Sequence, residues 1–289
     1  MNHESVKLEL RQNENFASLE RELPKTECLI ILGGGIDQVT ARNVETLREE
    51  KIWKPSRYVV ETDPAIASRD KRTGLRKKSS KDEELDKDLV VHGGNAYLIA
   101  GIQFLDEMRG RGMTPRRIIF AAGRPDYIQN VTSEMEADEG KVMFKEFQRR
   151  TSTESLEGTV IEVRGEGSKN TAGDLLNGLK ATLDGGLKSA VVIVTEARME
   201  RTEAMYAVLQ EKFPKLSQID TTFISAEDLL HRRYAERAST NRIFEEMQKK
   251  LKESALWEET KRREAKGIDD LKKGNYDLRI SGVDTSGLV

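Results

Sequence analysis

The stretch that decides the fold is ECLIILGGG, residues 27–35. A short apolar run followed at once by glycines is typical of a buried parallel strand that ends in a tight loop. The chain contains six short apolar runs that are strand candidates, at residues 27–32, 57–61, 117–122, 159–163, 190–195 and 220–225. Apolar residues at helical spacing lie between most of them, at residues 94–111, 134–150, 171–183 and 199–213. This alternation predicts an α/β fold with a mainly parallel sheet.

Two regions depart from the alternation. Residues 62–91 hold the basic run RDKRTGLRKK and then the acidic run KDEELDKD, which is typical of a charged insertion. We predict a solvated loop there; the alternative is a patch whose Arg and Lys side chains face phosphates. From Ala226 onward the pattern is helical and highly charged, with apolar residues that could form a packing stripe. We therefore expect an α/β domain over residues 1–225, a C-terminal helical extension over residues 226–289, and a loose tail from Gly267.

The composition excludes some classes of function. The 289 residues carry a formal net charge of −2, which argues against a protein that coats nucleic acid or anionic membrane over its whole surface. The chain has no stretch of the roughly 18 apolar residues that a membrane helix needs. Cys28 is the single cysteine and lies inside the first apolar run, so an intramolecular disulfide is excluded and a core position is expected. We predict a cytoplasmic protein.

The residues that follow the predicted strands are the candidate site, because ligands of open parallel sheets bind beyond the carboxyl ends of the strands. Gly33, Gly34 and Gly35 can lay backbone N–H groups against a phosphate or carboxylate, or can simply form a tight turn. The pattern matches neither the dinucleotide fingerprint nor a P-loop. Asp37 is a candidate general acid or base, or a hydroxyl acceptor; the alternative is a cap for the next helix.

The loop after the fourth strand candidate is rich in polar groups. Ser168, Asn170 and Thr171 stand where a helix begins, and the free N–H groups at such a place favour an anion. Thr171 is also a good N-cap, with Asp174 three residues on in a capping-box pattern. Glu166 is the second candidate catalytic residue, since a carboxylate beside these donors could take a proton or bind a ribose hydroxyl.

The loop after the fifth strand candidate carries two arginines. Arg198 and Arg201 flank the start of a helix, where arginines suit bidentate capture of phosphate or carboxylate. The alternative is a pair of surface arginines that bridge neighbouring glutamates. The remaining candidate ligand contacts are Gly94, Asn95, Gly123, Arg124 and Thr195. His92 could approach the same site, but the three histidines match no metal-ligand spacing, and no metal site is expected.

Taken in order, these loops resemble the SanA/YdcF-like family. The matching pieces are LGGG at 32–35, GGNAYLIAGIQFL at 93–105, IIFAAG at 118–123, SKNT at 168–171 and VIVTEARMERTEA at 192–204. The resemblance covers about residues 27–225. It implies a Rossmann-like three-layer sandwich and a pocket formed by the first glycine loop, the Ser-x-Asn-Thr loop and Arg201. It also implies a nucleotide-type ligand, with S-adenosylmethionine as the example.

The chain departs from the pattern of that family at three positions. Arg198 stands where members commonly have a His, Asn95 stands where they often have an Arg, and Glu166 lies one place closer to the Ser-x-Asn-Thr loop than usual. These differences affect the expected catalysis more than the expected fold.

Three functions follow from these observations. The first is an enzyme acting on a phosphorylated or nucleotide-like small molecule, with Asp37 or Glu166 handling the proton. The second is a non-catalytic module that binds a metabolite and signals through the C-terminal helices, which are also the candidate oligomer contacts. The third is a scaffold that binds nucleic acid through residues 69–78, against which the near-neutral charge argues.

Overall fold

A computed structural model describes residues 26–42, 49–56, 92–124, 138–152, 156–235, 238–273, 280 and 282–289. Its centre is a five-stranded sheet, in which every pair of neighbouring strands is parallel. The strands are β1 (Cys28–Leu32), β4 (Arg117–Ala121), β5 (Val160–Val163), β6 (Ser189–Val194) and β7 (Asp220–Ser225), in the order β5-β4-β1-β6-β7. This is the 3-2-1-4-5 order of a doubly wound Rossmann-like sheet. The predicted α/β fold with a parallel sheet is confirmed.

The central strand is apolar because it is covered on both faces. All five residues of β1 are buried, and it pairs with β4 on one side and β6 on the other. Cys28 lies in this strand with no exposed surface, and burial raises the pKa of its thiol to about 12. The thiol is therefore a core group, as the sequence predicts.

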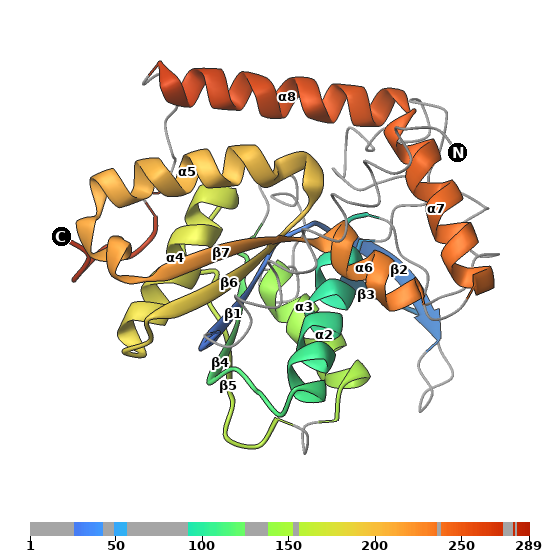
Figure 1. Cartoon of the computed structure of the whole chain (residues 1–289), viewed down its shortest axis with the longest axis horizontal. Coiled ribbons are helices and arrows are strands. Elements are labelled where there is room, and N and C mark those ends of the chain that lie inside the picture. Colours follow the sequence, from blue (N-terminus) through green and yellow to red (C-terminus); the bar gives the residue numbers. More distant parts are fainter. Residues whose placement is uncertain are drawn as a thin grey trace, which may run out of the picture.

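Helices cover both faces of the sheet and make the sandwich three layers thick (Figure 1). Helices α2 (Gly94–Gly110), α3 (Glu139–Arg150) and α6 (Ala226–Ala235) form one layer, with α2 packed against both α3 and α6. Helices α4 (Thr171–Asp184) and α5 (Met199–Lys212) form the other layer. The short 3-10 helices η5 (Glu196–Arg198) and η6 (Pro214–Gln218) precede and follow α5. Four of the predicted helical patterns correspond to α2, α3, α4 and α5.

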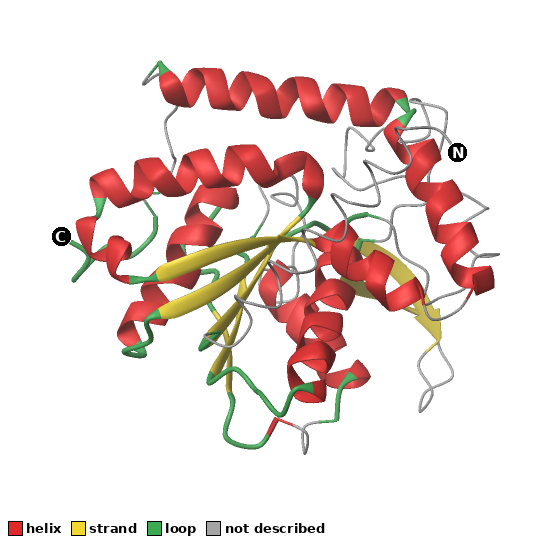
Figure 2. Cartoon of the chain, viewed as in Figure 1, coloured by secondary structure: helices red, strands yellow, loops and turns green. Residues whose placement is uncertain are grey.

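The structure differs from the prediction directly after the glycine loop. An antiparallel hairpin of β2 (Ile36–Arg42) and β3 (Glu49–Pro55) follows it, where the sequence suggested a helix (Figure 2). Asp37 lies within β2, paired with Lys54, so its alternative role as a helix cap is wrong. The strand predicted at 57–61 and the charged insertion at 62–91 lie outside the described residues.

The C-terminal helices pack against the sandwich. Helix α7 (Ala238–Lys252) contacts α6, and α8 (Ala255–Lys272) lies alongside α5 and also contacts η5 (Figure 1). The loose tail predicted from Gly267 is wrong for the described residues. Helix α8 continues to Lys272, and Ile280, Val283 and Leu288 are buried because they pack on the hydrophobic core. Among the described residues, no helix has the length and apolar character that crossing a membrane requires.

Candidate functional site

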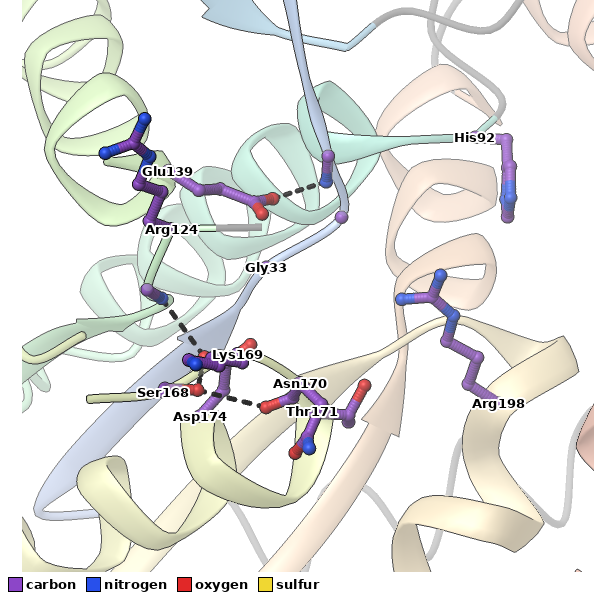
Figure 3. Close-up of a pocket in the computed structure, with 13 residues that line it drawn as sticks. Gly33, His92, Arg124, Glu139, Ser168, Lys169, Asn170, Thr171, Asp174 and Arg198 are labelled. Atoms are coloured by element: carbon purple, nitrogen blue, oxygen red, sulfur yellow. Dashed lines mark hydrogen bonds between the residues drawn. The ribbon is translucent and has the colours of Figure 1, made fainter. Parts of the chain in front are cut away.

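A cavity opens at the carboxyl ends of the strands, beside the point where the strand order reverses. The chain leaves β1 for β4 and β5 on one side and returns to β6 on the other side, so the loops after β1 and β6 diverge and leave a crevice. The cavity has a volume of about 160 Å³. Its described lining comes from six segments of the chain (Figure 3): Gly33, Gly34, Gly35, His92, Gly123, Arg124, Glu139, Ser168, Lys169, Asn170, Thr171, Asp174 and Arg198.

The glycine loop packs closely against the start of α2. A Cβ atom on Gly94 would lie 2.2 Å from the carbonyl oxygen of Gly35, so only glycine allows this approach. The backbone N–H groups of Gly94 and Asn95 donate to Ser56, to its Oγ at 2.9 Å and its carbonyl oxygen at 3.0 Å. Gly94 and Asn95 therefore serve packing, and neither lines the cavity. The glycine loop lines the cavity, and its close packing against α2 leaves no room for a Cβ atom at Gly34.

Two carboxyl groups of the protein already hold amides that the sequence assigned to a ligand. The N–H of Gly35 donates to Oε1 of Glu139, at the start of α3. The N–H of Gly123 donates to Oδ1 of Asp174 at 3.1 Å, and the Ser168 hydroxyl lies 2.6 Å from the same oxygen. The Ser168 hydroxyl also lies 3.1 Å from the carbonyl oxygen of Asn170. These bonds fix the positions of three loops relative to one another (Figure 3).

Asp174 is the most perturbed titratable group of the cavity. Its side chain is buried, and burial is the main reason that its pKa rises from 3.8 to about 8. The nearby charge of Glu139 raises the pKa further, whereas the hydrogen bonds from Ser168 and Gly123 and the charge of Arg198 lower it. Near neutral pH this carboxyl is therefore mostly protonated. A buried acid with a raised pKa in a cleft is a feature of binding and catalytic sites.

The N-terminus of α4 points into the cavity. Asn170 is its N-cap, because the side chain of Asn170 accepts from the N–H of Gly173 at 3.0 Å. The predicted cap at Thr171 is wrong by one residue, and Thr171 is instead the first residue of the helix. The N–H groups of Thr171 and Ala172 have no partner within the helix, as is general for a first helical turn. Such groups and the helix dipole favour an anion at this end.

Cationic side chains complete the lining. Arg124 follows β4, Lys169 lies in the loop before α4, and Arg198 ends η5 after β6. In Figure 3, Arg198 and His92 lie on one side of the view, and Arg124 lies on the other side near Glu139. Three cations and one helix N-terminus therefore line the same cavity as the two carboxyl groups.

Several predicted site residues lie elsewhere. Arg201 pairs with Glu264 of α8 at 3.1 Å, so this arginine anchors the C-terminal helix and does not line the cavity. Thr195 has no exposed surface and lies 3.2 Å from the hydroxyl of Tyr97, which makes it a core contact. Glu166 is exposed and outside the lining. Only the backbone of Asp37 is described, so the position of its carboxyl group relative to the cavity lies outside the described part of the chain.

The sequence pattern did not indicate Glu139, Lys169 or Asp174 as site residues. Asp174 carried a signal, three residues after Thr171, but that signal indicated a capping role within its own helix. Lys169 lies inside the SKNT loop, between the candidate residues Ser168 and Asn170, but was not itself named as a ligand contact. Glu139 carried no local signal, because its partner Gly35 is 104 residues away.

Searches of protein-family models, of curated proteins and of solved structures found no match to this chain. Within the described segments, no three His, Cys, Asp or Glu side chains are grouped as a metal site requires. The chemistry of the site must therefore be argued from the residues of the cavity themselves.

Proposed function

We propose that this chain binds a small oxyanion-bearing ligand, such as a phosphorylated or nucleotide-like metabolite, in the cavity beyond β1 and β6. The observation that carries the proposal is the convergence of Arg124, Lys169, Arg198 and the N-terminus of α4 on one cavity. Guanidinium groups and helix N-termini both bind phosphate and carboxylate by charge-assisted hydrogen bonds. The place of the cavity in a doubly wound sheet is the usual place for such ligands.

The size of the cavity bears on the ligand. A volume of about 160 Å³ admits a phosphoryl group with a small polar substituent, or the charged end of a larger molecule. S-adenosylmethionine, which the family resemblance implies, presents its carboxylate as the group for this site. It therefore belongs in the test panel beside phosphate and adenosine 5′-monophosphate.

The test measures thermal unfolding of the full chain against this panel, with wild type, Arg198→Ala and the control Arg164→Ala. Arg164 lies just after β5 and pairs with Glu162 at 2.7 Å outside the cavity. A bound ligand at 100 times its dissociation constant stabilises wild type by about 2.7 kcal/mol. Arg198→Ala is expected to weaken binding by roughly 10- to 100-fold, because a hydrogen bond to a charged group contributes about 1.5–3 kcal/mol.

Two results would contradict the proposal. One is a folded wild type that no member of the panel stabilises. The other is equal weakening of binding by Arg164→Ala and Arg198→Ala, which would show that the overall charge matters and the cavity does not.

A second function is favoured by one observation, the contacts between the C-terminal helices and the loop that carries Arg198. Lys252 of α7 pairs with Glu196 at 2.7 Å, and Glu264 of α8 pairs with Arg201. A module that transmits ligand binding to these helices would use such contacts. Ligand-dependent protection of α7 and α8 from amide hydrogen exchange, without turnover of the ligand, would distinguish it from an enzyme.

A further inference from the structure

The hydrogen bonds that described residues make to the side chain of Asp174 engage one of its two carboxyl oxygens. Only 8% of the residue is exposed, and it lines the cavity. Both hydrogen bonds that the described residues make to it reach Oδ1, from the N–H of Gly123 and from the hydroxyl of Ser168. Oδ2 is therefore the oxygen left for a ligand. Because two donors from different loops hold Oδ1, the orientation of Oδ2 is set before a ligand arrives.

The surroundings of Asp174 favour the neutral form of its carboxyl group over the ionised form. Five titratable side chains line the same cavity, each from a different part of the chain: Glu139 at the start of α3, Arg198 at the end of η5, Lys169 before α4, Arg124 after β4 and His92 before α2. The negative charge of Glu139 disfavours ionisation of Asp174, and the positive charge of Arg198 favours it. Burial decides the balance, since a carboxylate with little exposed surface loses most of its hydration.

We propose that Asp174 binds the ligand as a neutral carboxylic acid, which donates a hydrogen bond from Oδ2 to an oxygen of the anionic group. This inference rests on the proposed function and names the chemistry of the same site. An ionised Asp174 would repel an oxyanion at this position, whereas a protonated one supplies the donor that the oxyanion needs. The site therefore selects ligands whose anionic group offers an unprotonated oxygen, such as sulfate, phosphate or a phosphomonoester.

Ligand and proton then bind together. The ligand site and the proton on Asp174 are occupied in the same state, so binding takes up a proton whenever the free protein has lost it. Above the pKa of Asp174 in the free protein, which is about 8, the affinity for the ligand decreases as pH rises. The decrease approaches tenfold per pH unit. Below that pKa the affinity does not change through this group.

The test uses inorganic sulfate as the probe, because the charge of sulfate stays constant across the range of interest. Binding is measured by calorimetry between pH 7 and pH 9.5 with wild type and with Asp174→Asn. The amide of the variant can accept the same two bonds at Oδ1 and donate from Nδ2, but it does not titrate. Lys169, Arg124, Arg198, Glu139 and His92 are unchanged in the variant, so the difference between the two pH profiles isolates Asp174.

The expected result has three parts. Asp174→Asn binds sulfate at pH 7 within a fewfold of wild type. Its affinity then stays nearly level to pH 9.5, while that of wild type falls toward tenfold per pH unit above pH 8. Calorimetry of wild type at pH 9 in two buffers of different ionisation enthalpy shows proton uptake that approaches one per sulfate. This last measurement needs no variant, and circular dichroism at each pH checks that wild type is folded.

Parallel pH profiles for wild type and variant, or no proton uptake by wild type, would overturn the role of Asp174 while leaving anion binding intact. A folded wild type that does not bind sulfate at pH 7 would overturn this inference, and one that also binds no member of the earlier panel would overturn the proposed function with it. The two failures are therefore distinguishable.

Discussion

Replacing Asp174 with Asn is expected to change how the stability of the folded chain depends on pH, even without a ligand. Folding raises the pKa of this carboxyl from 3.8 to about 8. Between these two values the folded state holds a proton that the unfolded state has released. The free energy of unfolding of wild type therefore falls as pH rises through this window, and the loss is complete above pH 8.

The magnitude follows from the width of the window. One proton of difference changes the free energy of unfolding by about 1.4 kcal/mol per pH unit. Between pH 5 and pH 8, wild type should lose on the order of 4 kcal/mol relative to Asp174→Asn, which keeps the bonds at Oδ1 and has no charge to bury. Other groups titrate in both proteins, so the difference between the two is the quantity to compare.

Urea unfolding followed by circular dichroism at pH 5, 6, 7 and 8 measures this difference. Asp184→Asn is the matched control, because it is the same substitution at the other end of α4, where the side chain is 55% exposed and pairs with Lys180. That control should follow wild type at every pH. A constant difference between wild type and Asp174→Asn from pH 5 to pH 8 would refute the reasoning, since it would mean that Asp174 is already ionised in the folded state.

Two further predictions concern packing around the site. Gly123→Ala places a Cβ atom 2.2 Å from the carbonyl oxygen of Ser168, a backbone atom that cannot turn away, so we expect a loss of about 1–3 kcal/mol in urea unfolding. Gly110→Ala, at the exposed end of α2 with nothing within 4 Å, is its control and should cost nothing measurable; equal losses would contradict the close contact. Glu264→Gln removes a charged partner of Arg201, whose side chain is only 22% exposed, and should destabilise the chain by about 1–3 kcal/mol. Glu253→Gln, which breaks an exposed pair with Lys249, should change stability by less than about 0.5 kcal/mol, and a similar effect of both variants would show that the Arg201 pair contributes no more than a surface pair.

The three central strands of the sheet, β1, β4 and β6, could be predicted from the sequence because they are buried on both faces. Runs such as ECLIIL and AVVIVT do not alternate between apolar and polar residues. This pattern can be recognised without knowing which strands pair with them. The hairpin of β2 and β3 could not be predicted from the sequence. Its strands contain many charged and polar residues, so their extended form depends on pairing with each other and carries no apolar pattern.

The loops that form the site could be predicted from the sequence, whereas several of its individual residues could not. The glycine loop, Ser168, Asn170 and Arg198 were indicated because each follows a strand or opens a helix. The sequence did not show which of Arg198 and Arg201 lines the cavity, because this depends on where η5 ends and α5 begins. Arg198 lies at the end of the 3-10 helix, whereas Arg201 lies one turn later and faces α8. The carboxyl groups that line the cavity were missed since their bonds join residues 51 and 104 positions apart.

The contacts of the C-terminal helices also set an order of assembly during synthesis. Domains form progressively as the chain leaves the ribosome. The strands, the glycine loop and Arg198 are all made before the residues that brace the Arg198 loop. Glu264 of α8 follows its partner Arg201 by 63 residues. Lys252, which pairs with Glu196, is the last residue of α7, the helix before α8. A nascent chain can therefore form its sheet before the contacts that brace the Arg198 loop exist, and the proposed ligand site is complete only after α8 has been synthesised.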